Sequence, residues 1–213
     1  MGFVDLLKKR AKESVKTIVL PETEDMRTLE ATDKILKEGV AKIILIGNEE
    51  EINKKAKEGG FDISGATIVD PETSDKTQAY IDKFVELRAK KGMTPEKAKE
   101  ILHTQYPYYG VMMVKMGDAD GMVSGACHST ADTLRPCLQI LKTKPGTKLV
   151  SAFFLIVVPD CEYGANGAFV FADSGLNQNP TPEELSAIAA SSAESFQLLV
   201  QEEPVVAMLS HST

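Results

Sequence analysis

Residues 124–136, SGACHSTADTLRP, bring together many side chains that can do chemistry. Ser129, Thr130 and Thr133 carry hydroxyl groups that can donate hydrogen bonds to an anion. Arg135 adds a permanent positive charge, and its planar guanidinium suits a phosphate group. Because helix starts attract anions, this pattern predicts an anion-binding segment in which Arg135 carries the charge and the three hydroxyl groups support it.

The same segment also fits an ordinary capped helix. Ser129 and Asp132 have the spacing of a capping box, in which a hydroxyl group accepts a backbone N–H one turn later. Pro136 disfavours a helix interior, so the helix either begins near Asp132 or kinks at Pro136. The pattern leaves both interpretations open. The scarcity of arginine favours the anion site, because Arg135 lies among apolar segments where a lone cation is costly without a partner.

Cysteine chemistry is the competing hypothesis for this region. His128 and Cys161 form a candidate nucleophile pair, and Cys127, His128, Cys137 and Cys161 form a candidate zinc set. A free cysteine is more often a small buried apolar residue, and no two of these cysteines have the short Cys-x-x-Cys spacing. We therefore expect neither a cysteine nucleophile nor a bound metal.

Three further places need weighing. PETEDMRTL (21–29) places carboxylates where they favour a helix start, and Arg27 within it could instead reach a ligand crevice. Arg88 lies on a long charged helix, where a solvated side chain is the default. Asp173 and Ser174 follow a predicted strand in a loop rich in Gly, Asn and Pro, which is either a site or a simple connection.

The elements that position these residues alternate between strands and helices. Apolar runs at 16–22, 42–48 and 66–71 predict strands, and the periodic segment 24–38 predicts a helix that ends at Gly39. A strand, a helix and a strand without a hairpin turn form a βαβ unit, which builds a parallel sheet. Further helices are expected at 75–91, from Pro95 onward and at 106–116, and one more strand is expected at 119–125. The segment 124–136 then lies at the carboxyl end of a strand, the usual ligand crevice of such folds.

The second half is expected to hold buried strands. KTKPGTK (142–148) is the best linker candidate. The run at 149–160 predicts a central strand, 167–173 another, and 181–199 a helix with a capping-box start. Residues 204–213 begin as one more buried strand, after which a loop and a helix normally follow. We therefore expect the chain to be a truncated or partial protein.

Composition excludes several classes of function. The chain has 213 residues, a net charge of −7 and a sequence pI near 5.1, which argues against nucleic acid or an anionic membrane as the main partner. The longest apolar run, 152–158, is far shorter than the roughly 20 residues of a membrane span. Three cysteines, an odd number, suggest free thiols in a reducing compartment, so we expect a cytoplasmic protein.

Five motifs resemble, in the same order, those of the phosphate acetyl/butyryl transferase family: PETEDMRTL, VSGACHSTADTLRP, VPDCEYG, FADSG and VVAMLSHST. The resemblance implies an acyltransferase that interconverts acetyl-CoA and phosphate with acetyl phosphate and CoA. It implies two three-layer α/β domains with mostly parallel sheets around a cleft, similar to isocitrate and isopropylmalate dehydrogenases, and a homodimer. On this chain the first domain would cover residues 1–145, and residues 146–213 would begin the second.

The resemblance also implies roles for single residues. Family members use arginines of the cleft for CoA and phosphate, which correspond to Arg88 in VELRAKKG and Arg135 in ADTLRP. We expect Arg135 to be catalytic, and Arg88, Ser129, Thr130 and Thr133 to bind substrate. The resemblance implies that the CoA thiolate attacks the acetyl group of acetyl phosphate directly. CoA is then a substrate, and neither a metal nor another cofactor is needed.

The chain departs from the family pattern in one respect. In the family a catalytic aspartate, a serine and a further arginine lie beyond the position where this chain stops, so we expect this chain alone to be inactive or nearly so. A domain that senses CoA esters without turnover is an alternative function. A dehydrogenase of the related fold is a second alternative, but the chain contains no G-x-G-x-x-G. Acyl-chain preference cannot be predicted from these residues.

Overall fold

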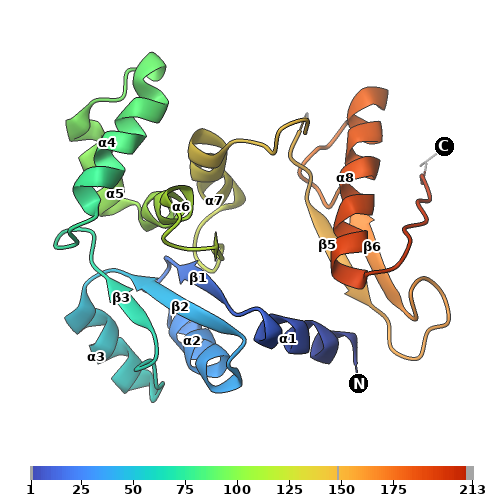
Figure 1. The fold of residues 1–213 in the computed structure, drawn as a ribbon, viewed down its shortest axis with the longest axis horizontal. Coiled ribbons are helices and arrows are strands. Elements are labelled where there is room, and N and C mark those ends of the chain that lie inside the picture. Colours follow the sequence, from blue (N-terminus) through green and yellow to red (C-terminus); the bar gives the residue numbers. More distant parts are fainter. Residues whose placement is uncertain (1, 148, 210–213) are drawn as a thin grey trace. The chain divides into compact units, whose positions relative to one another are not determined.

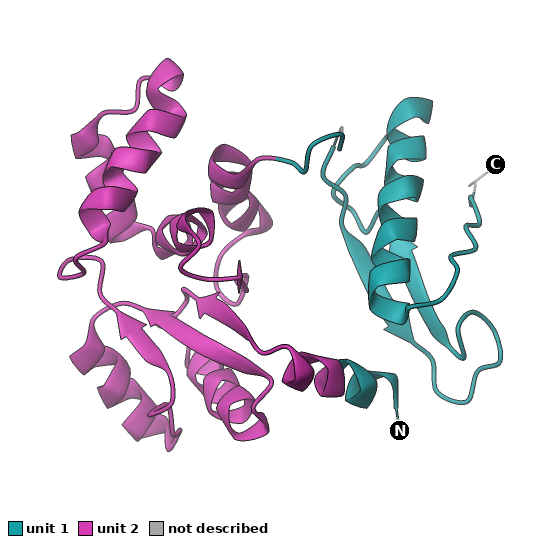
Figure 2. Cartoon of the chain, viewed as in Figure 1, with its two compact units in different colours: residues 1–7, 143–213 teal, residues 8–142 magenta. Residues whose placement is uncertain are grey.

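The computed structural model describes residues 2–147 and 149–209 and divides the chain into two compact units (Figures 1 and 2). One unit comprises residues 8–142, and the other comprises residues 1–7 and 143–213. The division after residue 142 coincides with the start of the predicted linker at 142–148. None of the helices in the described ranges is long and apolar enough to cross a membrane.

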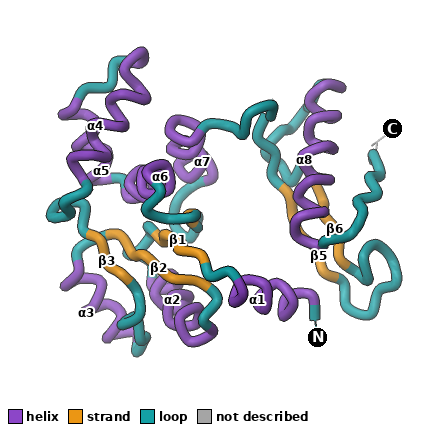
Figure 3. Tube along the Cα trace, viewed as in Figure 1, coloured by secondary structure: helices purple, strands orange, loops and turns teal. Residues whose placement is uncertain are grey.

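The unit formed by residues 8–142 contains a four-stranded parallel sheet with the order β3-β2-β1-β4. Figure 3 shows β1, β2 and β3 of this sheet with helices around them. The α/β class and the parallel sheet predicted for this half are therefore confirmed. The predicted strand at 119–125 is much shorter than expected, because only two of its residues pair with β1. The strands are β1 (Lys16–Leu20), β2 (Ala41–Ile46), β3 (Thr67–Val69) and β4 (Gly121–Met122).

Helices cover both faces of this sheet, which explains why the central residues of β1 and β2 are apolar. Successive strand residues point to opposite faces: Ile44 and Ile46 belong to one buried cluster, and Ile43 and Leu45 to another. The first cluster is completed by α4 (Thr77–Arg88), α5 (Pro95–Thr104) and α6 (Tyr106–Met116), and the second by α2 (Met26–Glu38) and α3 (Glu49–Gly59). These layers make a three-layer unit, preceded by α1 (Phe3–Glu13).

Local signals set several helix ends as predicted. Gly39 closes α2 in the left-handed conformation, with φ of 66°. The side chain of Thr94 caps α5, and Pro95 occupies its first turn. The predicted helix at 75–91 is α4 followed by one 3₁₀ turn, η1 (Ala89–Lys91).

Gly110 allows α6 to pack closely on the sheet. A Cβ atom at this position would lie 2.8 Å from Sδ of Met122 and 3.1 Å from Cγ1 of Val19. These two residues belong to β4 and β1, the strands whose carboxyl ends lead into the polar segments. The absence of a side chain thus brings helix and strands together directly beneath those segments.

The helix after β4 is expected either to begin near Asp132 or to kink at Pro136. It begins at Thr130 rather than near Asp132, and α7 (Thr130–Pro136) includes the proline at its end. The chain then widens into the π-helix η2 (Cys137–Leu141), where the N–H of Lys142 donates to the carbonyl of Cys137 at 3.0 Å. A π turn is a common way for a helix to absorb an interruption of its regular hydrogen bonds.

The unit formed by residues 1–7 and 143–213 differs from the prediction of buried, mostly parallel strands. Its described strands, β5 (Phe153–Val157) and β6 (Ala168–Ala172), are antiparallel, and several of their apolar side chains are exposed. The short turn at 158–167 explains this pairing, because parallel strands need a long crossover. The predicted helix is α8 (Pro182–Val200), with the expected capping box at Thr181.

The predicted strand at 204–213 is wrong in its described part. Residues 204–209 form no strand, and the side chains of Val205 and Leu209 are 95% and 92% exposed. The remaining residues of that prediction, 210–213, lie outside the described residues.

Candidate functional site

The loops that follow β1 and β4 meet at the carboxyl end of the parallel sheet. Because β1 pairs directly with β4, residues 21–25 and residues 123–129 leave neighbouring strands on the same side. The hydroxyl group of Thr23 donates to the carbonyl of Ile46 at 2.7 Å and anchors the first loop to the end of β2. The position is the one that the sequence predicts for a ligand crevice.

The centre of this arrangement is Glu22, a residue that the sequence analysis did not single out. Its side chain is almost completely buried, and the residue is 2% exposed. One carboxylate oxygen accepts the backbone N–H groups of Gly125 at 2.7 Å and Ala126 at 2.8 Å. The other accepts the backbone N–H groups of Cys127 and His128, each at 3.0 Å. Nδ1 of His128 lies 2.8 Å from the same oxygen.

These contacts keep Glu22 ionised. Burial raises the pKa of the carboxyl group, but hydrogen bonds from Cys127, Ala126, His128 and Gly125 outweigh burial and lower the pKa to about 2. The anion at the four consecutive N–H groups is therefore a side chain of the protein. The anion-binding segment predicted from the sequence is thus divided, because its first part is occupied by Glu22 and only the part after His128 faces other partners.

The cysteine and metal hypotheses find little support in this geometry. Sγ of Cys127 lies 3.3 Å from a carboxylate oxygen of Glu24, and burial together with Glu24 and Glu22 raises the pKa of the thiol to about 12. A thiol whose pKa is raised in this way is a poor nucleophile near neutral pH. Among the described residues, Glu22, Cys127 and His128 offer three donor atoms within 4.8 Å of one another, but Glu22 already accepts several hydrogen bonds.

The other cysteines of the predicted zinc set lie elsewhere. Sγ of Cys137 donates to the carbonyl of Thr133 at 3.5 Å, inside the helical segment that follows the loop. Cys161 belongs to the other unit, where its Sγ lies 3.9 Å from the carbonyl of Tyr163. His128, the predicted base for Cys161, is engaged with Glu22 instead.

The capped helix predicted at Ser129 is present. Its Oγ accepts the backbone N–H of Asp132 at 3.2 Å and also donates to the Asp132 carboxylate at 2.6 Å. Nη1 of Arg135 donates to the other oxygen of Asp132 at 3.0 Å. The side chain of Arg135 is 53% exposed, so its remaining N–H groups can reach a ligand. Thr130 is exposed at the first position of the helix.

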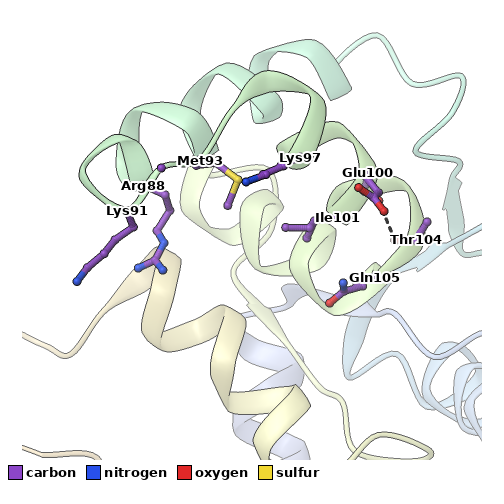
Figure 4. A pocket seen from close by; sticks show the side chains of 9 residues that line it. Arg88, Lys91, Met93, Lys97, Glu100, Ile101, Thr104 and Gln105 are labelled. Atoms are coloured by element: carbon purple, nitrogen blue, oxygen red, sulfur yellow. Dashed lines mark hydrogen bonds between the residues drawn. The ribbon is translucent and has the colours of Figure 1, made fainter.

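Arg88 is not the solvated surface residue that its helix suggested. It lies at the end of α4 and lines a pocket of about 280 Å³ (Figure 4). In this view Arg88 and Lys91 extend from one end of the pocket, and Glu100 and Gln105 lie at the other. Nε of Arg88 is buried without a hydrogen-bond partner. Buried donors of this kind are uncommon in folded proteins and call for an explanation.

Arg88 and Arg135 both influence the hydroxyl group of Tyr108 electrostatically. Burial raises the pKa of the Tyr108 hydroxyl, and the positive charges of Arg135 and Arg88 lower it. The hydroxyl of Tyr108 donates to Oε1 of Gln139 at 3.3 Å. Both arginines therefore act electrostatically on the same tyrosine, although they lie far apart in the sequence.

Arg27 reaches the loop after β4, as one of the two hypotheses for it held. Its guanidinium forks onto Asp25, with Nη2 of Arg27 2.6 Å from the carboxylate, and also donates to the carbonyl of Ala126. The side chain of Arg27 is 71% exposed, so it lies at the rim of the loop.

Asp173 organises a loop in the other unit. Its carboxylate accepts the Oγ–H of Ser151 at 2.9 Å, the N–H of Leu176 at 2.6 Å and Nδ2–H of Asn177 at 2.7 Å. Burial raises the pKa of Asp173, but these hydrogen bonds, led by that of Asn177, hold it well below its usual range. The backbone N–H of Ser174 donates to the carbonyl of Ala152 at 3.0 Å. These contacts support the interpretation that Asp173 and Ser174 belong to a structural connection rather than to a binding site.

Comparison with known proteins gives a consistent picture. The family model described as phosphate acetyl/butaryl transferase matches residues 2–213. A phosphate acetyltransferase of Acetivibrio thermocellus is 55% identical over all 213 residues of this chain, which cover 63% of that protein. A phosphate acetyltransferase of Thermoanaerobacterium thermosaccharolyticum is 52% identical over 213 residues, covering all of this chain and 64% of the relative. The chain thus spans less than two thirds of the length of these curated relatives.

Solved structures agree with this assignment. A phosphotransacetylase from Streptococcus pyogenes is 38% identical, with a TM-score of 0.84 over 93% of this chain and 58% of that one. A phosphotransacetylase from Staphylococcus aureus is 36% identical, with the same TM-score and the same coverage. On the family match over nearly its whole length, the chain belongs to the phosphate acetyl/butaryl transferase family.

Proposed function

We propose that the protein is an acyltransferase that interconverts acetyl-CoA and phosphate with acetyl phosphate and CoA. The proposal rests on where the buried side-chain atoms without a hydrogen-bond partner lie in the protein. Among the described residues, four buried side-chain atoms lack a hydrogen-bond partner, namely those of Arg88, His103, Ser124 and Thr133. Three of the four belong to the segment 124–136 or to Arg88, the positions expected to bind phosphate groups. Unpaired buried donors at such positions are suited to an anionic substrate.

The geometry refines the roles within this site. The hydroxyl of Ser129 both donates to and accepts from Asp132, so Thr130 and Thr133 are the hydroxyl groups left for a ligand. Arg135 uses one donor on Asp132 and keeps the others for the substrate. In the proposed reaction the CoA thiolate attacks the acetyl carbonyl of acetyl phosphate, a C–S bond forms, and the C–O bond to phosphate breaks. Arg135 stabilises the negative charge on the departing phosphate.

We also propose the finer properties that the resemblance implies. CoA enters as a substrate, no metal or other cofactor takes part, and the protein is a cytoplasmic homodimer with small-molecule partners. The net charge of −7 supports the absence of nucleic acid and membrane partners. The cysteines at positions 127, 137 and 161 are free thiols, which supports a reducing compartment.

The test is an assay of CoA-dependent phosphate release from acetyl phosphate. It uses the longest gene product that carries residues 1–213, as wild type and as Arg135→Ala. We expect Arg135→Ala to lower kcat/KM by about 10²–10³-fold, the usual effect of removing one group that stabilises developing charge. Lys34→Ala is a matched control, because Lys34 forms a similar exposed ion pair, with Glu30 at 2.6 Å, on α2.

The outcomes separate the alternatives. Turnover that Arg135→Ala leaves unchanged would keep the enzyme but return residues 129–136 to a capped helix. Binding of CoA esters without turnover would favour the sensing domain. The same assay on residues 1–213 alone tests the expectation that this stretch by itself is inactive or nearly so.

A further inference from the structure

The loop between β4 and α7 depends on Glu22 for its backbone hydrogen bonds. The N–H of Val123 donates to the carbonyl of Val19 at 3.0 Å, which is the last contact that continues the β4 pairing. The N–H of Thr133 then donates to the carbonyl of Ser129 at 3.0 Å, as α7 begins. In the described structure, the four consecutive N–H groups between these points, from Gly125 to His128, all donate to Glu22.

Glu22 is itself fixed before it meets the loop. It lies two residues beyond β1, and its neighbour Thr23 is buried and bonded to the end of β2. Arg27 binds an acceptor of the same loop, because its guanidinium donates to the carbonyl of Ala126. The loop is therefore held by an acceptor and by a donor, both from the segment that follows β1.

We propose that Glu22 is a positioning residue of the phosphate site: a resident anion that fills the backbone donors of Gly125–His128 and so fixes where α7 presents Thr130, Thr133 and Arg135. This inference rests on the proposed function. A row of four convergent N–H groups would otherwise attract an anion from solution. With a buried negative charge already bound there, a phosphate group is directed to the side chains beyond Ser129.

The contacts argue against other roles for Glu22. The carboxylate is 2% exposed and its two oxygens already accept four N–H groups, so it is not placed to take a proton from a substrate. What remains is an effect that acts through the loop.

The test compares Glu22→Gln with Asp33→Asn in the longest gene product that carries residues 1–213. Glu22→Gln keeps the size of the side chain and removes its charge. Asp33 is a matched control, because it is another buried carboxylate of the same unit and accepts the backbone N–H of Asp62 at 3.2 Å. Two properties are measured: hydrogen exchange of the peptide covering residues 123–129, and the separate KM values for acetyl phosphate and CoA.

We expect Glu22→Gln to speed exchange at residues 125–128 about tenfold or more, because hydrogen bonds to a charged acceptor are weakened together. Exchange in α6 should stay unchanged. We expect the KM for acetyl phosphate to rise about tenfold while the KM for CoA changes less than about twofold. The reason is that Glu22 positions the side chains proposed to bind the phosphate group of acetyl phosphate and no side chain proposed to bind only CoA. Asp33→Asn should alter neither property.

Several results would overturn the inference. These are unchanged exchange at 125–128, an unchanged KM for acetyl phosphate in an active enzyme, or equal rises in both KM values that match the Asp33→Asn variant. If Glu22→Gln does not fold, Glu22→Asp, which keeps the charge but shortens the reach, is measured in the same way and must give the same pattern. If the wild type has no transferase activity, the proposed function fails, and exchange alone then decides whether Glu22 orders the loop.

Discussion

Removal of the Glu22 charge should change how the stability of the protein depends on pH. Folding lowers the pKa of Glu22 from an ordinary value of 4.5 to about 2. A depressed carboxyl pKa stabilises the fold above the unfolded value, and this stabilisation is lost as pH falls through the folded value. At roughly 1.4 kcal/mol for each pKa unit, Glu22 contributes about 3 kcal/mol at neutral pH, of which about 2 kcal/mol is lost by about pH 3.

The difference between two variants isolates this contribution, because many carboxylates titrate in the same range. Urea unfolding followed by circular dichroism gives the free energy of unfolding of wild type and Glu22→Gln between pH 7 and pH 3. We expect the difference in free energy of unfolding between wild type and Glu22→Gln to be constant down to about pH 5 and to narrow by about 2 kcal/mol at about pH 3. Phe84→Leu is a control that removes core packing but no titrating group, so its gap should not depend on pH. A constant Glu22→Gln gap over the whole range would refute the reasoning.

Three further predictions concern the thiol, the helix packing and a cap. Because burial and two carboxylates raise the pKa of Cys127 to about 12, iodoacetamide at about pH 8 should alkylate it at least tenfold more slowly than a free cysteine, and Glu24→Gln should speed the reaction, as measured by mass spectrometry. Gly110→Ala should lower the free energy of unfolding by about 1–3 kcal/mol, because its Cβ would lie 2.8 Å from Met122; an unchanged urea midpoint would contradict this. Thr181→Ala should cost about 1 kcal/mol in urea unfolding because it removes the side-chain oxygen that accepts the backbone N–H of Glu184, whereas Thr181→Ser should cost little.

The parallel sheet could be predicted because its signals are local. Apolar residues 18–20 and 43–46 mark the two strands, and the helix between them carries its own cap and stop. The length of β4 was overestimated, because the segment 119–125 does not reveal how many of its residues a neighbouring strand can pair with. The run at 149–160 was placed in a parallel sheet for a similar reason: hydrophobicity predicts a strand but not its partner or direction.

The site was predicted in part. The cap at Ser129 and the choice of Arg135 came from residue type and spacing, whereas Arg88 came from the family resemblance, and both arginines influence the pKa of Tyr108. The role of Glu22 could not be predicted, although the residue lies in the motif PETEDMRTL, because its partners are backbone N–H groups more than 100 residues away. Backbone donors have no signature in a sequence. The one available signal was a glutamate just after a buried strand, where a charge is costly unless it is paired.

Glu22 and Asp173 have a common role, each within its own unit. Each follows a strand closely, is held ionised by hydrogen bonds, and satisfies consecutive backbone N–H groups of a loop. Loops with free N–H groups bind anions without much discrimination, because any small anion fits a backbone nest. When the protein's own carboxylates fill these positions, recognition passes to side chains such as Arg88 and Arg135, whose planar donors distinguish phosphate by shape as well as by charge. For a protein proposed to handle both free phosphate and the phosphate groups of CoA, internal carboxylates would thus reduce non-productive anion binding, and Glu22→Gln should make the protein more sensitive to inhibition by sulfate.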